Sequence, residues 1–175
     1  YEKDKDEVIA TFENILEDVH NIHRMEKPIE AVSLATNAYV GAVNTRTCVG
    51  VWNLESGKLM KTLVGGQHSA IVYHSAITAN AQYVVSAESK NIIIFDVETE
   101  RVVSTHLQPD VLQLLLNDDD TKCIALSKGQ EGKGNIICRS IPSGDTVYQY
   151  EFMMMKPHKA SVLTSDGLFL VVPGM

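Results

Sequence analysis

The chain has 175 residues, 45% of them hydrophobic, which is enough for one globular domain with a core of its own. Its 15 basic and 22 acidic residues give a net charge of −7, and this acidic balance argues against nucleic acid as a direct partner. No uncharged stretch reaches the roughly 20 apolar residues of a membrane-spanning helix, so we expect no membrane span.

The first expected element is an amphipathic helix from Asp4 to about Arg24. Acidic residues crowd its start and basic residues its end, as the helix dipole favours, and Pro28 ends it. Its apolar residues recur with the 3.6-residue period of a helix. They form a stripe that must be buried against the β domain or another part of the protein, and they are Val8, Phe12, Ile15, Leu16, Val19 and Ile22.

After Pro28 the pattern changes to short β-rich runs separated by turn residues, which is typical of an all-β domain. Trp52, Phe95 and Arg139 hold the same place in three repeated segments, 43 and then 44 residues apart. A second anchor, Tyr39 and Tyr83, repeats after 44 residues. These intervals match the about 40–45 residues of a four-stranded propeller blade.

Each repeat divides into four short strands with turn signals between them. A fourth unit begins at Lys159 and stops mid-blade, whereas a propeller closes with typically four to eight blades. We therefore expect a piece of a larger propeller. The predicted strands lie near 29–35, 38–43, 48–52 and 58–64, then 72–78, 82–87, 91–96 and 101–106, then 111–116, 121–126, 135–140 and 145–152.

The segment Val32–Leu63 resembles the WD40 repeat, above all in the strand that ends in Trp52-Asn53 and the Ser56-Gly57 turn after it. This resemblance covers roughly residues 29–172. It implies that the first strand of each blade lines a central channel, that the fourth lies outermost, and that the domain binds proteins. The predicted fold is mainly β: an N-terminal helix and linker at 1–28, then at 29–175 a partial WD40-like β-propeller of three blades and the start of a fourth.

The repeats also depart from the family. In WD40 repeats an Asp in the turn six positions before the Trp bonds a His near the repeat start, but Arg46 and Ser89 stand at that turn position here. His68 is the one candidate relic of the family's Gly-His pair, and we expect it to face solvent. Divergent repeats after a helix also resemble those of the NACHT and WD repeat domain-containing proteins, signalling nucleotidases whose propellers act as sensors or scaffolds.

Two loops are candidate partner contacts. The Gly-rich segment Lys128–Gly134 lengthens the middle hairpin of the third unit as a flexible insertion, and the WD40 resemblance implies that such hairpins open on a partner-binding face. Met153–Met155 form an adaptable apolar loop that either fills the core or contacts a partner. The predicted partner-binding residues are His68, Gln130, Glu131, Lys133, Met154, Met155 and Lys156.

No residue pattern points to catalysis. His20 and His23 share a helix face, but the helix dipole explains them without a metal. The glycines of Lys128–Gly134 lack the following Lys and helix of a phosphate loop. Asp118–Asp120 lacks the Gly and Glu of a calcium loop and reads as a solvated turn. We therefore predict no enzyme and no catalytic, metal or cofactor site.

The prediction is a non-catalytic protein–protein interaction scaffold within a larger WD-repeat signalling protein. Its partners would be other proteins or other parts of the same longer chain, not nucleic acid or membrane. Cys48, Cys123 and Cys138 each sit in an apolar run, as buried reduced cysteines do, which favours the cytoplasm.

Two alternatives remain open. One is a regulatory or sensor propeller of a NACHT-type signalling nucleotidase. The other is a metal-dependent hydrolase on a propeller scaffold, which would need His and carboxylate ligands converging on the channel. The first strands instead supply mainly Val32, Leu34, Ile77, Leu114 and Leu116.

Overall fold

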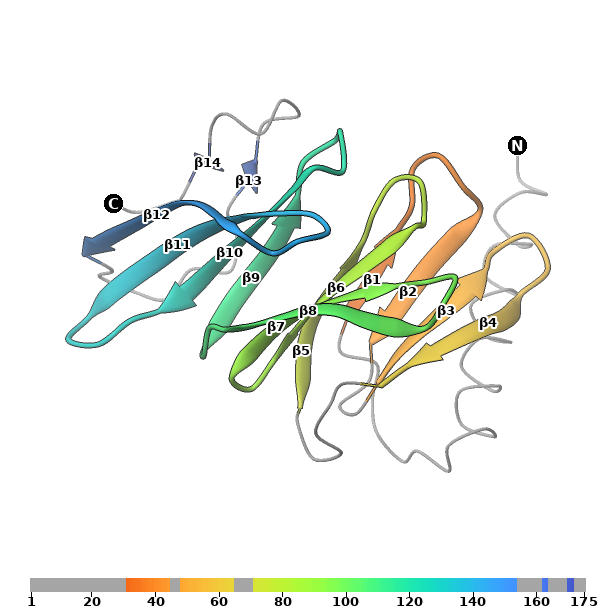
Figure 1. Cartoon of the computed structure of the whole chain (residues 1–175), viewed down its shortest axis with the longest axis horizontal. Coiled ribbons are helices and arrows are strands. Elements are labelled where there is room, and N and C mark those ends of the chain that lie inside the picture. The colour runs from red at the N-terminus through yellow and green to blue at the C-terminus, as the bar shows by residue number, and fades with distance from the viewer. Residues whose placement is uncertain (1–30, 45–47, 65–70, 154–161, 164–169, 172–175) are drawn as a thin grey trace, which may run out of the picture.

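The computed structural model describes residues 31–44, 48–64, 71–153, 162–163 and 170–171. These residues form three four-stranded antiparallel sheets that lie side by side, with a short two-stranded sheet after them (Figure 1). The expected mainly β architecture of four-stranded blades is therefore confirmed. The predicted N-terminal helix lies outside the described residues and stays a prediction.

Each four-stranded sheet is one blade, and its strands follow the order of the chain. The first blade contains β1 (Ala31–Leu34), β2 (Val40–Asn44), β3 (Val49–Asn53) and β4 (Lys58–Leu63). The second contains β5 (Val72–Ile77), β6 (Tyr83–Glu88), β7 (Asn91–Asp96) and β8 (Arg101–Leu107). The third contains β9 (Val111–Leu116), β10 (Lys122–Lys128), β11 (Lys133–Ser140) and β12 (Thr146–Met153).

The remaining strands, β13 (Val162–Leu163) and β14 (Leu170–Val171), pair with each other where the fourth unit was expected to begin. Among the complete blades, β1, β5 and β9 lie next to one another, and β4, β8 and β12 are the strands farthest from them. The first strand of each blade is therefore innermost and the fourth outermost, as the WD40 resemblance implied.

The turn between the third and fourth strands uses the same local chemistry in the first two blades. Asn53 Oδ1 accepts a hydrogen bond from the Ser56 N–H, and Asp96 Oδ1 accepts one from the Thr99 N–H, both at 2.8 Å. Short polar side chains favour such turns because they bond the backbone two or three residues on. The Thr99 backbone and hydroxyl bonds also hold the pKa of Asp96 below its usual value.

Two apolar clusters join neighbouring blades. Because side chains alternate along a strand, each central strand presents one face to the preceding blade and the other to the next. The contact between the first and second blades includes Ala42, Val49, Val51, Leu63, Val84, Ile93 and Phe95. The contact between the second and third includes Val85, Ala87, Ile92, Ile94, Leu114, Cys123 and Ala125.

The repeat position marked in the sequence by Trp52, Phe95 and Arg139 is buried in every blade, with exposed fractions of 0%, 1% and 6%. Arg139 replaces the aromatic ring in the third blade. Its Nη1 donates hydrogen bonds to the Thr146 hydroxyl at 3.0 Å and to the Gly144 carbonyl at 3.3 Å. Burial lowers the pKa of its guanidinium.

Buried polar side chains also link the blades. Asn44 is fully buried, and its Oδ1 accepts a hydrogen bond from the Ser75 hydroxyl of the second blade at 3.1 Å. Asp120 reaches back from the third blade, and its carboxylate accepts from the backbone N–H groups of Ala79 at 2.7 Å and Asn80 at 3.2 Å. The turn Asp118–Asp120 is therefore a contact between blades as well as the expected surface turn.

Candidate functional site

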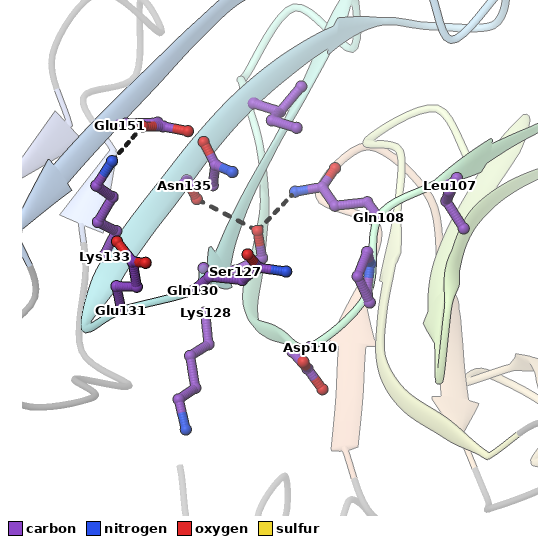
Figure 2. A pocket seen from close by; sticks show the side chains of 13 residues that line it. Leu107, Gln108, Asp110, Ser127, Lys128, Gln130, Glu131, Lys133, Asn135 and Glu151 are labelled. Carbon is purple, nitrogen blue, oxygen red and sulfur yellow. Dashed lines mark hydrogen bonds and ion pairs between the residues drawn. The ribbon is translucent and has the colours of Figure 1, made fainter.

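A cavity of about 520 Å³ opens between the second and third blades, where β8 leads into β9 and β10 turns into β11 (Figure 2). We call it the groove. Its volume lies within the roughly 300–1,000 Å³ of ordinary ligand sites. Its floor is Gln108, Ser127 and Asn135, and its charged rim is Asp110, Lys128, Glu131, Lys133 and Glu151.

The β10–β11 hairpin forms one side of the groove. Its strands pair as far as Lys128 and Gly134, and the Lys133 N–H donates to the Gln130 carbonyl at 3.0 Å. Glu131 and Gly132 have φ angles of 55° and 74°, which is the left-handed pair of a tight type I′ turn. The residues expected to form a flexible insertion therefore extend two strands and close them with a compact turn.

The floor of the groove is held by a buried amide. Gln108 is 2% exposed, and its Nε2 donates to the Ala125 carbonyl and to the Ser127 hydroxyl, both at 3.3 Å. Ser127 donates in turn to the Asn135 carbonyl at 3.5 Å, so Figure 2 shows a continuous chain of bonds across the floor. This glutamine therefore anchors the connection between β8 and β9 to the third blade.

The rim carries both signs of charge on exposed side chains. Lys133 Nζ lies 3.3 Å from Glu151 Oε2, with exposed side-chain fractions of 46% and 57%. Exposed ion pairs of this kind contribute at most about 1 kcal/mol. Asp110, Lys128 and Glu131 are also exposed at the rim. The groove therefore offers a polar floor and mixed charges, which suit a ligand with both hydrogen-bond donors and acceptors.

A second, smaller cavity of about 340 Å³ lies against the innermost strands. It is lined by all five apolar residues expected to face the channel, namely Val32, Leu34, Ile77, Leu114 and Leu116. Within the described ranges, no three His, Cys, Asp or Glu residues approach closely enough to hold a metal ion.

The structure brings three of the predicted contact residues together: Gln130, Glu131 and Lys133 all line the groove. The other four, His68, Met154, Met155 and Lys156, lie outside the described residues. Sequence reasoning missed Gln108, Asp110 and Glu151. A polar Gln-Pro-Asp sequence directly after a strand was the available signal for the first two, but it reads equally well as an ordinary loop.

The three cysteines lie in the interior of the blades. Cys48, Cys123 and Cys138 are all buried, and no disulfide joins them. Burial raises the pKa of Cys123 to about 12, so this thiol stays protonated at neutral pH.

No helix in the described part of the chain is long and apolar enough to cross a membrane.

Comparison with known proteins agrees with this architecture. The solved structures "Structure of U3-55K" and "Crystal structure of RRP9 WD40 repeats" each share 14% identity and a TM-score of 0.59 with the chain. The two matches cover 72% and 71% of this chain, but only 40% and 39% of the length of the solved chains. At this sequence identity the likeness shows the fold alone. No curated protein matches. A family model described as NWD2 C-terminal beta-propeller matches residues 19–175, and the chain therefore belongs to the NWD2 C-terminal beta-propeller family.

Proposed function

We propose that this chain is a protein-interaction scaffold and that the groove holds a partner polypeptide. The observation that carries the proposal is the convergence of Gln130, Glu131 and Lys133 with Gln108 around one cavity. The family to which the chain belongs supports the same function, because propellers of WD40 type commonly present loop tips to other proteins.

The chemistry of the groove favours a polypeptide over a small anion. Three carboxylates, on Asp110, Glu131 and Glu151, face only two lysines, so a phosphate would meet net repulsion. Peptide groups carry one donor and one acceptor each and match a rim of both signs. The partner would be another protein or another part of a longer chain.

A charge-swap variant tests this proposal. In Lys128→Glu with Glu131→Lys, both rim charges reverse while the net charge stays constant. The matched control, Glu55→Lys with Lys58→Glu, makes the same swap on exposed residues of the first blade. Proximity labelling around the intact protein in cells should lose specific neighbours in the groove variant and keep them in the control. Identical neighbour sets for the wild type and both variants would contradict the proposal.

A second candidate function is a regulatory propeller of a signalling nucleotidase. It is favoured by the description of the family as a C-terminal propeller, which fits a domain joined to others. In that case the groove would hold another segment of the same protein. The groove variant should then change nucleotide hydrolysis by the full-length protein, and the first-blade control should not. Equal hydrolysis rates in the two variants would count against this candidate.

A further inference from the structure

The first blade has an apolar face that turns away from the second blade. In the register of β2 and β3, Gly41 pairs with Trp52 and Val43 pairs with Gly50, so these four residues share one side of the sheet. The opposite side, with Ala42, packs on the second blade. We call the side with Trp52 the outward face.

The outward face is buried although the described blades do not cover it. Trp52 is 0% exposed and Val43 is 2% exposed. Within the described ranges, the apolar residues clustered with them are Leu54 and Leu59, which belong to the same blade. Phe95, the equivalent of Trp52, is covered by the preceding blade. By the same geometry, Trp52 needs a cover on the side away from the second blade.

The shape of the outward face differs from that of a normal blade contact. The second blade has Val84 and Ile93 at the places where the first has Gly41 and Gly50. A Cβ on Gly50 would come within 2.8 Å of Trp52 Nε1, so the indole lies over this glycine. Side chains of the same blade occupy the space that the two glycines leave: Leu34 and Leu54 lie over Gly41, and Trp52 and Leu59 lie over Gly50. The outward face therefore presents an apolar surface formed by these side chains.

We infer that the N-terminal segment covers the outward face in place of a preceding blade. The predicted helix from Asp4 to Arg24 carries the one long apolar stripe of the sequence outside the blades, including Phe12 and Leu16. At 1.5 Å per residue it would be about 30 Å long, enough to span a sheet whose four strands lie about 4.8 Å apart. The apolar side chains of the stripe match the apolar surface that Trp52, Leu54 and Leu59 form over the two glycines.

The connection between helix and blade also permits this docking. Residues 25–30 separate the end of the predicted helix from β1, and six extended residues span up to about 20 Å. β1 belongs to the same sheet as the outward face, so this six-residue connection is long enough for the predicted helix to reach that face. The inference is independent of the groove, which lies between the other two blades.

Trp52 is the single tryptophan of the chain, so tryptophan fluorescence reports whether the outward face is covered. In the whole 175-residue chain, Phe12→Asp with Leu16→Asp places two charges in the stripe. We expect a red shift of tryptophan emission and roughly twofold or greater acrylamide quenching, because the indole gains contact with water. The matched control, Asn14→Asp with Asn21→Asp, adds the same charge on the polar side of the predicted helix and should behave as the wild type.

Three outcomes would overturn the inference. Wild-type quenching in the stripe variant would show that something else covers Trp52. Quenching that falls with protein concentration in the wild type would show that the cover is a second copy of the chain. Equal increases in the stripe variant and in its control would show that charge alone is responsible. If the aspartates abolish the β-sheet circular dichroism, Phe12→Ala takes their place and should still raise quenching above that of Asn14→Ala.

Discussion

The two contacts between complete blades are built from different chemistry at equivalent positions. Between the first and second blades, Phe95 fills the interface and is 1% exposed among branched aliphatic residues. Between the second and third, Arg139 stands at that place, beside the small residues Cys123 and Ala125. The second contact therefore buries less apolar volume at its centre.

Polar and backbone contacts compensate in the second interface. Asp120 binds two backbone N–H groups of the second blade, and the Ser104 hydroxyl donates to the Pro142 carbonyl at 3.3 Å. Gly144 lies directly against the His106 ring. The groove opens at one end of this same interface. The groove thus lies beside the contact in which a charged side chain replaces the central aromatic ring.

The largest expected effect is at the apolar contact. Phe95→Ala should lower the free energy of unfolding by about 3–5 kcal/mol, because it leaves a cavity where two blades interlock. Urea unfolding followed by circular dichroism measures the loss. Val103→Ala on the exposed strand β8, 45% exposed in the wild type, is the control and should change stability by about 0.5 kcal/mol or less. Similar losses in both would refute the central role of Phe95.

The next largest effect is expected at Gly144, in the contact between the second and third blades. Gly144 has a φ of 77°, and a Cβ there would overlap the His106 imidazole. Gly144→Ala should therefore cost roughly 2–3 kcal/mol from backbone strain and overlap together. In a His106→Ala background the overlap disappears and only the strain remains, so the same substitution should cost less. An equal cost in both backgrounds would show that the close packing does not matter.

A smaller effect is expected at the carboxylate that joins the second and third blades. Asp120→Ala removes the acceptor of the Ala79 and Asn80 N–H groups and should cost about 1–2 kcal/mol in thermal or urea unfolding. Asp118→Ala, an exposed neighbour in the same turn, is the matched control and should change stability little. If the two variants unfold alike, the contact contributes nothing to stability.

The smallest effect concerns a position that differs between the blades. Asn44 and Glu88 both end their second strands, but burial raises the pKa of Glu88 above its ordinary 4.5. The folded state thus binds this proton more tightly than the unfolded state, and ionised Glu88 destabilises the fold at higher pH. Glu88→Gln should raise the urea midpoint at neutral pH, and its advantage should vanish as the pH falls towards 4.5. A pH-independent difference between the two proteins would contradict this.

Most of the fold was predictable from the chain because its signals are local. Tyr39 with Tyr83, and Trp52 with Phe95, repeat at blade spacing, and alternating strands with Asn or Asp turns mark where each strand ends. The strand bounds near Arg139 followed from the same spacing, although the aromatic residue is missing there. Local periodicity survives such substitutions because backbone pairing, not one side chain, defines a blade.

The candidate site was predictable only in part. Gln130, Glu131 and Lys133 stand on a hairpin that the turn residues reveal, so one side of the groove was visible. Gln108 comes from the connection between β8 and β9, and Glu151 from β12. Gln108 is placed by its bonds to β10 and Glu151 by the pairing of β12 with β11, and the turn residues of the hairpin reveal neither contact. The role of Asp120 was hidden because the N–H groups that donate to its carboxylate lie 40 and 41 residues away in the chain.

Each blade carries a register shift at the same place, next to Trp52, Phe95 and Arg139, where the third strand pairs with the fourth. Such bulges increase local twist and interrupt the flat row of unpaired N–H and C=O groups that an outer strand presents. β8 and β12 both need this protection, because Val102, Val103 and Leu107 are exposed along β8, and Val147, Tyr150 and Met153 along β12. The register shift that recurs in the three complete blades therefore hinders the outermost strands from pairing with the edge strand of another sheet and aggregating.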